Sequence, residues 1–475
     1  MRSLAFLLVL PICSAAESNA LSISANIQGR HVPFGTILDP IFAAPDSDQI
    51  VGYTRCGDSA IWTGHYLAAE AFRYKVTGSA DALANAQEAL AGLTLLTDVT
   101  GTNLLARCAV PLDSGYLASI VQQESANGSY MGSSAAGKAY MWIGNTSRDE
   151  YLGAFFGLCV AYDMIGDAPT RAQIAALITR LLDNLLAHVW TIVLPDLSVS
   201  TTFVIRPDQQ LTLLQIGRHV NAKYNGAYSS LAILAPSVIA PISVDAADTH
   251  SSYFKFNLDY ISFYHLIGLE DSSFRKIFYS SAYGILRAAT VTHQNAHFDM
   301  IDRSISGPNP GRDFDTRVFL DQWLKRPRRD PYVDLRGVYP SCGSPGTEAC
   351  NPIPILARVP TDFLWQRDPF QLTGGGSGVI EGSGIDYILP YWMARYYGIE
   401  RQPPNRRLRP LAAMVHSRIL GSSKSMDSGT RWRKSFCSSP NFLASRFLTL
   451  RGAGLVWSRM PRLFRWSIQF ASIAI

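Results

Sequence analysis

The sequence predicts an all-α fold built from stacked helical hairpins. Three amphipathic segments end in the same pattern, Tyr-x-x-x-Gly, at Tyr74–Gly78, Tyr162–Gly166 and Tyr264–Gly268. A shorter form, Tyr396-Tyr-Gly398, ends a fourth segment, and a further helical segment follows each of the first three glycines. Because one hairpin cannot bury its own apolar face, neighbouring hairpins must stack, and one ring-like domain is expected over residues 57–400.

The N-terminus has the features of a secretion signal. Arg2 precedes a short apolar core and the small residues Ser14-Ala15-Ala16, and the core is too short to span a bilayer. We therefore expect residues 1–16 to be a signal peptide and the mature chain, without an integral membrane segment, to be secreted or periplasmic. Residues 17–56 contain three prolines and little periodicity, and are expected to form an irregular N-terminal segment.

The first two hairpins are predicted from periodicity and caps. The helix over 58–77 has apolar residues at spacings of three and four, Gly78 stops it, and Ser79 caps a return helix over 80–99. The second hairpin begins at the capping box Ser147-Arg-Asp-Glu150 and returns through about residue 193. Further helices are expected over 207–233, 253–268, 273–292, 312–326 and 384–398, strands over 199–205 and 237–244, and a Pro- and Gly-rich surface insertion over 327–380.

Cysteine usage agrees with export. Cys342 and Cys350 bracket a loop rich in proline and glycine, and Cys56 and Cys108 flank the first hairpin, so a disulfide is expected for each pair. The alternative is free buried thiols. Because Cys-x-x-Cys, P-loop, Gly-x-Gly-x-x-Gly and His-Glu-x-x-His motifs are absent, we expect no metal and no cofactor.

The charge is unevenly distributed. Residues 401–475 hold 14 Lys and Arg residues and one acidic residue, which leaves 28 basic and 36 acidic residues elsewhere. The mildly acidic body gives no indication of a nucleic-acid partner. The basic tail is interpreted either as a surface-binding extension or as sequence that does not belong to the domain.

Two further motifs carry a family resemblance. Asp58-Ser-Ala-Ile-Trp-Thr-Gly-His-Tyr-Leu-Ala-Ala and Ser147-Arg-Asp-Glu-Tyr-Leu-Gly153, with the Tyr-x-x-x-Gly endings, resemble the six-hairpin glycosidase superfamily over about residues 50–400. The resemblance implies an (α/α)6 toroid with long loops and a few minor strands. It also implies a poly- or oligosaccharide substrate, because the superfamily contains glycoside hydrolases, unsaturated uronyl hydrolases and some polysaccharide lyases.

Asp58 and Asp149 are the candidate catalytic residues. Asp58, Trp62 and His65 share one face of the first helix, where a carboxylate, a stacking ring and an imidazole suit a sugar. Glu150 is explained by the capping box, which leaves Asp149 without a structural task, and Arg148 beside it can bind a substrate carboxylate. In the hydrolases of the superfamily, paired acids act as general acid and base. The structural alternatives are a helix cap for Asp58 and a surface ion pair for Asp149.

Three more residues are candidates for substrate binding: His297 in His293-x-x-x-His297, Glu381 in a glycine-rich loop, and Asp386 at the following helix start. Each has a structural alternative, as a core histidine or as part of a turn. The leading functional hypothesis is a secreted glycoside hydrolase. The alternatives are a non-catalytic carbohydrate-binding protein on the same fold and a polysaccharide lyase that uses Tyr66 or His297 to abstract a proton.

Overall fold

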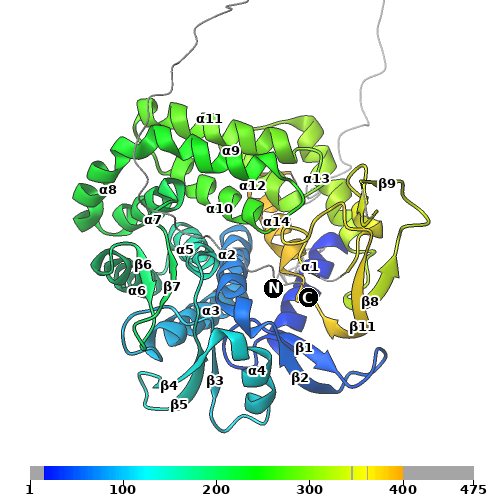
Figure 1. Ribbon diagram of the computed structural model, residues 1–475, viewed down its shortest axis with the longest axis horizontal. Helices are drawn as coiled ribbons and strands as arrows, with labels where there is room; N and C mark the ends of the chain where they lie inside the picture. The colour runs from blue at the N-terminus through cyan, green and yellow to red at the C-terminus, as the bar shows by residue number, and fades with distance from the viewer. Residues whose placement is uncertain (1–14, 344–345, 361, 400–475) are drawn as a thin grey trace, which may run out of the picture. The chain divides into compact units, whose positions relative to one another are not determined.

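The computed structural model describes residues 15–343, 346–360 and 362–399, which are mostly helical and carry small antiparallel sheets (Figure 1). All of these residues belong to one compact unit. The basic tail and residues 1–14 of the predicted signal peptide lie outside the described residues. The α-helices are α1 Ala15–Asn26, α2 Ser59–Thr77, α3 Ala80–Asp98, α4 Leu117–Gln123, α5 Arg148–Met164, α6 Ala168–Ala187, α7 Pro207–Val220, α8 Asn225–Leu231, α9 Ile239–Ala247, α10 Lys255–Gly268, α11 Ser273–Thr290, α12 Ala296–Ser306, α13 Pro310–Trp323 and α14 Ile385–Tyr396.

The predicted hairpins are confirmed as the pairs α2–α3, α5–α6 and α10–α11. Their starts use the expected caps: Ser79 accepts a hydrogen bond from the Ala82 amide, and Ser147 and Glu150 form a complete capping box. The repeated glycines end their helices by different geometries, however. Gly78 is left-handed (φ +66°) and donates to the Tyr74 carbonyl, whereas α5 ends at Met164 before an extended Ile165.

Helices that are not consecutive in the chain pack side by side. In the contact sequence α2, α5, α7, α10, α12, α14, each helix packs against the next, and α14 packs back against α2 (Figure 1). A second set of helices also packs against these: α3 on α2, α6 on α5, α11 on α10, α13 on α12 and α1 on α14. The first and last described helices are therefore neighbours.

The segment over 17–56 was expected to be irregular, and this expectation is wrong. It forms α1, a π-helical turn at Ile27–His31 and two strands, and α1 buries Ala20 and Ile23 in the core.

The sheets have the strand orders β2-β1-β11-β8, β3-β5-β4, β6-β7 and β10-β9. The strands are β1 Asp39–Phe42, β2 Ile50–Thr54, β3 Cys108–Pro111, β4 Ser129–Ser133, β5 Ala139–Ile143, β6 Thr191–Val193, β7 Val199–Thr202, β8 Arg329–Asp334, β9 Ser341–Cys342, β10 Glu348–Ala349 and β11 Thr373–Glu381.

Two other sequence predictions need correction. The expected strand over 237–244 is mostly α9, because a run of apolar residues without a clear period does not distinguish a strand from a helix. The expected surface insertion over 327–380 also enters the core: β11 pairs with β1, and Phe363 and Trp365 are buried. The expected strand over 199–205 is confirmed in part by β7.

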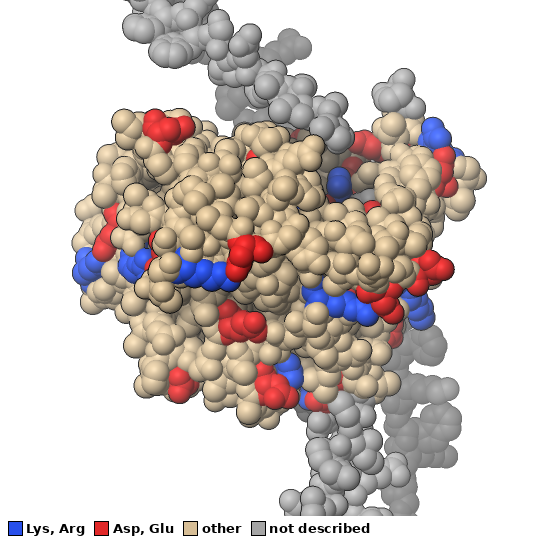
Figure 2. All heavy atoms as spheres, turned by 90° about the horizontal axis from the view of Figure 1, so that it is seen from below, with Lys and Arg blue, Asp and Glu red and all other residues tan. Residues whose placement is uncertain are grey.

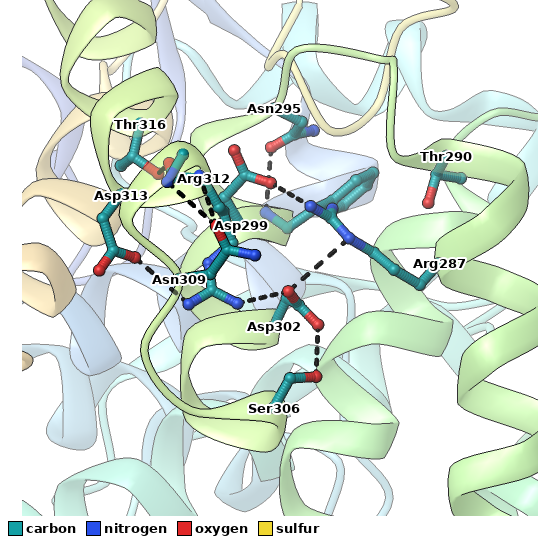
Figure 3. Close-up of polar contacts among 12 residues, drawn as sticks. Arg287, Thr290, Asn295, Asp299, Asp302, Ser306, Asn309, Arg312, Asp313 and Thr316 are labelled. Carbon is teal, nitrogen blue, oxygen red and sulfur yellow. Dashed lines mark hydrogen bonds and ion pairs between the residues drawn. The ribbon is translucent and has the colours of Figure 1, made fainter. Parts of the chain in front are cut away.

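Helix α12 buries charged side chains beside its apolar ones, Phe298, Met300 and Ile301. Arg287 of α11 donates to Asp299 at 2.7 Å, and Arg312 of α13 forms an ion pair with Asp302 (Figure 3). Asp302 also accepts hydrogen bonds from Ser306 and Tyr283. Since buried charges must be paired, this network ties α11, α12 and α13 together in addition to the apolar contacts of the core.

Helices α2 and α5 approach each other closely at glycines. A methyl group on Gly64 would overlap the backbone of Gly153, and one on Gly157 would overlap the backbone of Gly64. The two helices therefore meet backbone to backbone for about one turn. This contact sets the separation of their N-terminal ends, where Asp58 and Asp149 lie.

Charged residues of both signs are scattered over the face shown in Figure 2, without a large patch of one sign on that face. Among the described residues, the stretch Ala222–Ala247 alone is long and apolar enough to cross a membrane by length and composition. One such stretch is weak evidence and does not indicate an integral membrane protein.

Both expected disulfides, Cys56–Cys108 and Cys342–Cys350, are confirmed. They indicate an oxidising, extracellular or periplasmic environment, while the signal peptide stays a prediction.

We predict that Gly64→Ala lowers the free energy of unfolding by about 3 kcal/mol, because α2 and α5 must separate to admit the methyl group. Urea unfolding measures the change. The matched control is Gly284→Ala on the exposed face of α11, where an added methyl group meets no atom within 4 Å. This control should stabilise the protein by up to about 1 kcal/mol. Equal effects of the two substitutions would contradict the proposed role of the glycine contact.

Candidate active site

The two predicted catalytic carboxylates line one pocket. Its volume is about 380 Å³, and it opens at the N-terminal ends of α2 and α5. Strand β7 and the start of α10 add further side chains. The residues that line the pocket are Asp58, Ile61, Trp62, Arg107, Ser147, Arg148, Asp149, Thr201, Phe254, Asn257 and Gln366.

Asp58 occupies the N-cap position of α2 but makes no side-chain capping hydrogen bond. The capping alternative is therefore not realised, and 38% of the side-chain surface stays accessible. Loss of solvation raises the pKa of Asp58 to about 6, and the charges of Glu150 and Asp362 act in the same direction. Arg107 opposes the shift, with Nη1 4.0 Å from the Asp58 Oδ1 atom.

Asp149 follows Ser147 in the first turn of α5, where its backbone amide donates to the Ser147 hydroxyl. Burial raises the pKa of Asp149, and the negative charge of Asp58 raises it further. The charges of Arg107 and Arg148 lower it, but do not cancel the increase. The charge of Asp58 thus disfavours ionisation of Asp149.

Arg107 holds the inner side of the pocket, and sequence reasoning missed it. It forms an ion pair with the fully buried Glu150 at 2.9 Å, and donates to the Gly57 and Asn145 carbonyls. Its positive charge therefore acts on the structural acid Glu150 and on the two candidate catalytic acids, Asp58 and Asp149. The feature of the sequence that could have pointed to Arg107 was its position next to Cys108, a cysteine of an expected disulfide.

The Cys56–Cys108 disulfide joins the two segments that carry Asp58 and Arg107. Cys56 lies two residues before Asp58, and Cys108 directly follows Arg107. The Arg107 carbonyl also accepts a hydrogen bond from the Ala60 amide at 3.0 Å. The covalent link therefore restrains both a pocket carboxylate and the cation beside it.

Arg148 is the second cation of the pocket. Its guanidinium makes no hydrogen bond or ion pair with any residue in the described part of the chain, although Asp149 is adjacent. Burial lowers its pKa, and the charge of Arg206 contributes to this shift. A partly buried, unpaired guanidinium is suited to bind an acceptor group of a ligand.

The remaining lining residues form an aromatic and amide wall. Trp62 contributes only an edge, because it is 3% exposed and its ring packs against Phe363 at 4.5 Å between centroids. Phe254 is 40% exposed and offers a more open ring. The Gln366 amide lies 3.4 Å from the Asp58 carboxylate, and Asn257 lines the pocket at the start of α10. Trp62 therefore lies at the pocket without an open stacking face, and its role in substrate binding stays a prediction.

Two predicted histidines lie beneath the pocket rather than in it. His65 is fully buried, donates to the Ile61 carbonyl at 2.8 Å and accepts at Nε2 from the Asn257 amide. Burial lowers its pKa to about 4, so it is neutral and orients Asn257. His297 is buried among aromatic rings, and neither ring nitrogen has a hydrogen-bond partner among the described residues. Neither histidine can contact a ligand in the pocket.

Glu381 and Asp386 also lie outside the pocket. Glu381 accepts a hydrogen bond from Asn26 at 2.7 Å, and although burial acts against it, hydrogen bonds from His31 and Asn26 lower its pKa to about 2. Asp386 accepts the Leu364 amide at 3.0 Å and lines a separate cavity of about 40 Å³. Both carboxylates satisfy local polar groups, and the glycine-rich segment that precedes them is strand β11.

The lyase alternative loses its proposed bases. The Tyr66 hydroxyl lies two helical turns from Asp58, is 1% exposed and accepts a hydrogen bond from Gln28 at 2.9 Å. Like His297, Tyr66 is not among the pocket residues. A proton abstractor for a lyase reaction would have to be another residue.

The raised pKa of Asp58 predicts a pH-dependent cost to stability. An ordinary Asp titrates near pH 3.9 in an unfolded chain, so above that pH the unfolded state ionises more readily than the folded state. Asp58→Asn should therefore raise the melting temperature at about pH 7.5, and the gain should vanish below about pH 4. Thermal unfolding of both proteins across this range measures the effect. A gain that is equal at both pH values would contradict the electrostatic cause.

The Cys56–Cys108 link predicts a larger effect than the second disulfide. Removing it as Cys56→Ala/Cys108→Ala frees a loop closed over 52 residues, which costs about 4 kcal/mol by the chain-entropy account. Cys342→Ala/Cys350→Ala removes a link that closes only 8 residues, so it should lower the free energy of unfolding by less. Chemical unfolding under oxidising conditions compares the two. A larger loss from the shorter loop would contradict this ranking.

Comparisons with known proteins give no independent indication of function: the chain matches no family model, no curated protein and no solved structure. A function must therefore be inferred from the side chains of the pocket themselves.

Proposed function

We propose that the protein is a secreted carbohydrate-active hydrolase that cleaves glycosidic bonds in a poly- or oligosaccharide by means of Asp58 and Asp149. The observation that carries this proposal is the presence of both carboxylates in one pocket of about 380 Å³, where burial raises both pKa values and the charge of Asp58 adds to the rise for Asp149. A carboxyl group whose pKa is raised to about 6 stays protonated in weakly acidic solution, so one acid can be protonated while the other is ionised. General acid–base cleavage needs this state.

The fold of residues 57–400 is part of the proposal. We infer an (α/α)6 toroid of the six-hairpin glycosidase type, with α2, α5, α7, α10, α12 and α14 as the inner helices. The contact order, in which α14 returns to α2, supports a closed ring. The position of the pocket at the N-terminal ends of α2 and α5 supports a shared cleft at one end of that ring.

In the proposed reaction, the protonated carboxyl group donates its proton to the glycosidic oxygen as the C–O bond breaks. The ionised partner either activates a water molecule or attacks the anomeric carbon, which decides whether the stereochemistry is inverted or retained. Positive charge that develops on the sugar is stabilised by the ionised carboxylate. Asp149, next to Arg148, is the candidate for the ionised role.

The other pocket residues fit the recognition of a sugar. Arg148 can bind a carboxylate or hydroxyl group, and the Asn257 and Gln366 amides offer donors and acceptors. Phe254 supplies an exposed ring at the edge. A second pocket of about 320 Å³ shares Phe254 and Gln366 with the first, so the two can accommodate more than one sugar unit.

Asp149→Asn tests the proposal. It should lower kcat by about a hundredfold or more, since a general acid–base group is lost while shape is retained, and it should leave the affinity for the sugar largely unchanged. The assay screens the secreted protein against oligosaccharides with and without terminal unsaturated uronates. The unsubstituted enzyme should show a bell-shaped pH dependence with its acidic limb near pH 6.

The matched control is Asp163→Asn, which removes an exposed acid of the same helix α5, paired only with His219 at 2.7 Å, far from the pocket. Its turnover should equal that of the parent. Turnover that survives Asp149→Asn removes that residue from the mechanism. Saturable sugar binding without turnover by the parent protein would instead support the non-catalytic carbohydrate-binding alternative.

A further inference from the structure

We propose that His250, Glu348 and Asp368 form a binding site for one divalent cation of the zinc or manganese type, beside the second pocket. This site is additional to the carboxylate pair, and no metal was expected from the sequence. The three residues come from three separate segments: the loop after α9, strand β10, and the chain that precedes β11.

The ligand atoms of the three side chains converge. One nitrogen of His250 and one oxygen from each carboxylate all lie within 4.8 Å of one another. The His250 Nδ1 atom is 3.1 Å from Glu348 Oε2 and 3.6 Å from Asp368 Oδ2. Separations of this size between donors suit atoms that surround a metal ion at about 2.0–2.2 Å.

The His250 Nδ1 atom is buried, yet it makes no properly oriented hydrogen bond with any residue of the described ranges. A carboxylate oxygen at 3.1 Å would normally accept such a bond. The nitrogen is thus close to an oxygen of each carboxylate, as expected of three atoms that can surround one cation.

Neighbouring contacts hold the ligands in place, as they do in metal sites. The Phe370 amide donates to Asp368 Oδ1 at 2.8 Å, which leaves the Oδ2 atom directed toward His250. The Phe370 ring packs against the His250 ring with centroids 4.3 Å apart. Glu348 is fixed in the β9–β10 hairpin, whose strands are joined by the Cys342–Cys350 disulfide.

The ligand set indicates the class of cation. Imidazole nitrogen with two carboxylates suits zinc or manganese, whereas calcium prefers six to eight oxygen ligands. Three protein ligands leave coordination positions open. His250 and Asp368 line the second pocket, so an open position can face a ligand there.

Bound metal would restrain the loop that leads from His250 to Phe254. Phe254 lines both pockets, as does Gln366, two residues before Asp368. A cation at this position would therefore cross-link the loop over 248–254 to the segment over 366–368. The carboxylate pair itself makes no contact with the proposed site.

The test is metal binding by the chelator-treated full-length protein, measured by calorimetric titration with Zn²⁺ and by metal content after dialysis. The parent should retain one more equivalent of Zn²⁺ than His250→Ala and Asp368→Asn do, and should bind Zn²⁺ more tightly than Ca²⁺. The control is His188→Ala, an exposed histidine whose ring bonds to the Asn184 carbonyl, which should keep the full equivalent. Equal metal content in all four proteins, or a preference for Ca²⁺, overturns the proposal.

Co²⁺ substitution of the unaltered chain gives a second readout that does not depend on folding of the variants. Nitrogen and oxygen ligands predict a visible d–d spectrum without a strong thiolate charge-transfer band. A second group, Cys159, Asp163 and His219, also brings metal-ligand atoms together. A thiolate band as the only signal would place the metal there and would contradict the assignment to His250.

Discussion

The close approach of α2 and α5 is the contact on which the candidate site depends. Because Gly64 meets Gly153 and Gly157 without side chains between them, the two helices run nearer to each other than a Cβ atom would allow. Their N-terminal ends are brought together with them, and those ends carry Asp58 and Asp149. The repulsion that raises the pKa of Asp149 is thus a consequence of backbone packing about one to two turns away.

The cations of the pocket only partly neutralise these acids. Arg107 is committed to Glu150, the capping residue of α5, and reaches Asp58 only at 4.0 Å. Two guanidinium groups, those of Arg107 and Arg148, beside three carboxylates leave an excess of negative charge, which sustains the tendency to hold a proton. Glu150 therefore has two roles. It caps helix α5, and it forms an ion pair with Arg107, whose charge would otherwise be more available to neutralise Asp58 and Asp149.

The sequence predicted the elements whose signals are local. Caps, glycine stops and apolar periodicity located α2, α3, α5, α6, α10 and α11, and the unused carboxylate next to a capping box identified Asp149. Contacts between distant segments were not predictable. Arg107, Asn257 and Gln366 reach the pocket from segments far apart in the chain, and the ion pairs of α12 with Arg287 and Arg312 likewise join separate helices. Histidines on an apolar face, His65 and His297, were core residues, since a neutral imidazole can be buried at modest cost.

The pairing of β1 with β11, and of α1 with α14, has a consequence for how the chain folds. Ile41 lies opposite Ile380, so one edge of β1 stays unpaired until nearly all of the described chain has been synthesised, although β2 can pair with the other edge early. Contacts of such long sequence separation slow folding, because the intervening loop must be closed first. The surfaces that α1 and β1 offer to α14 and β11 would therefore remain uncovered during translation. A domain that is completed only by its last elements closes late, a property compatible with passage through a narrow translocation channel.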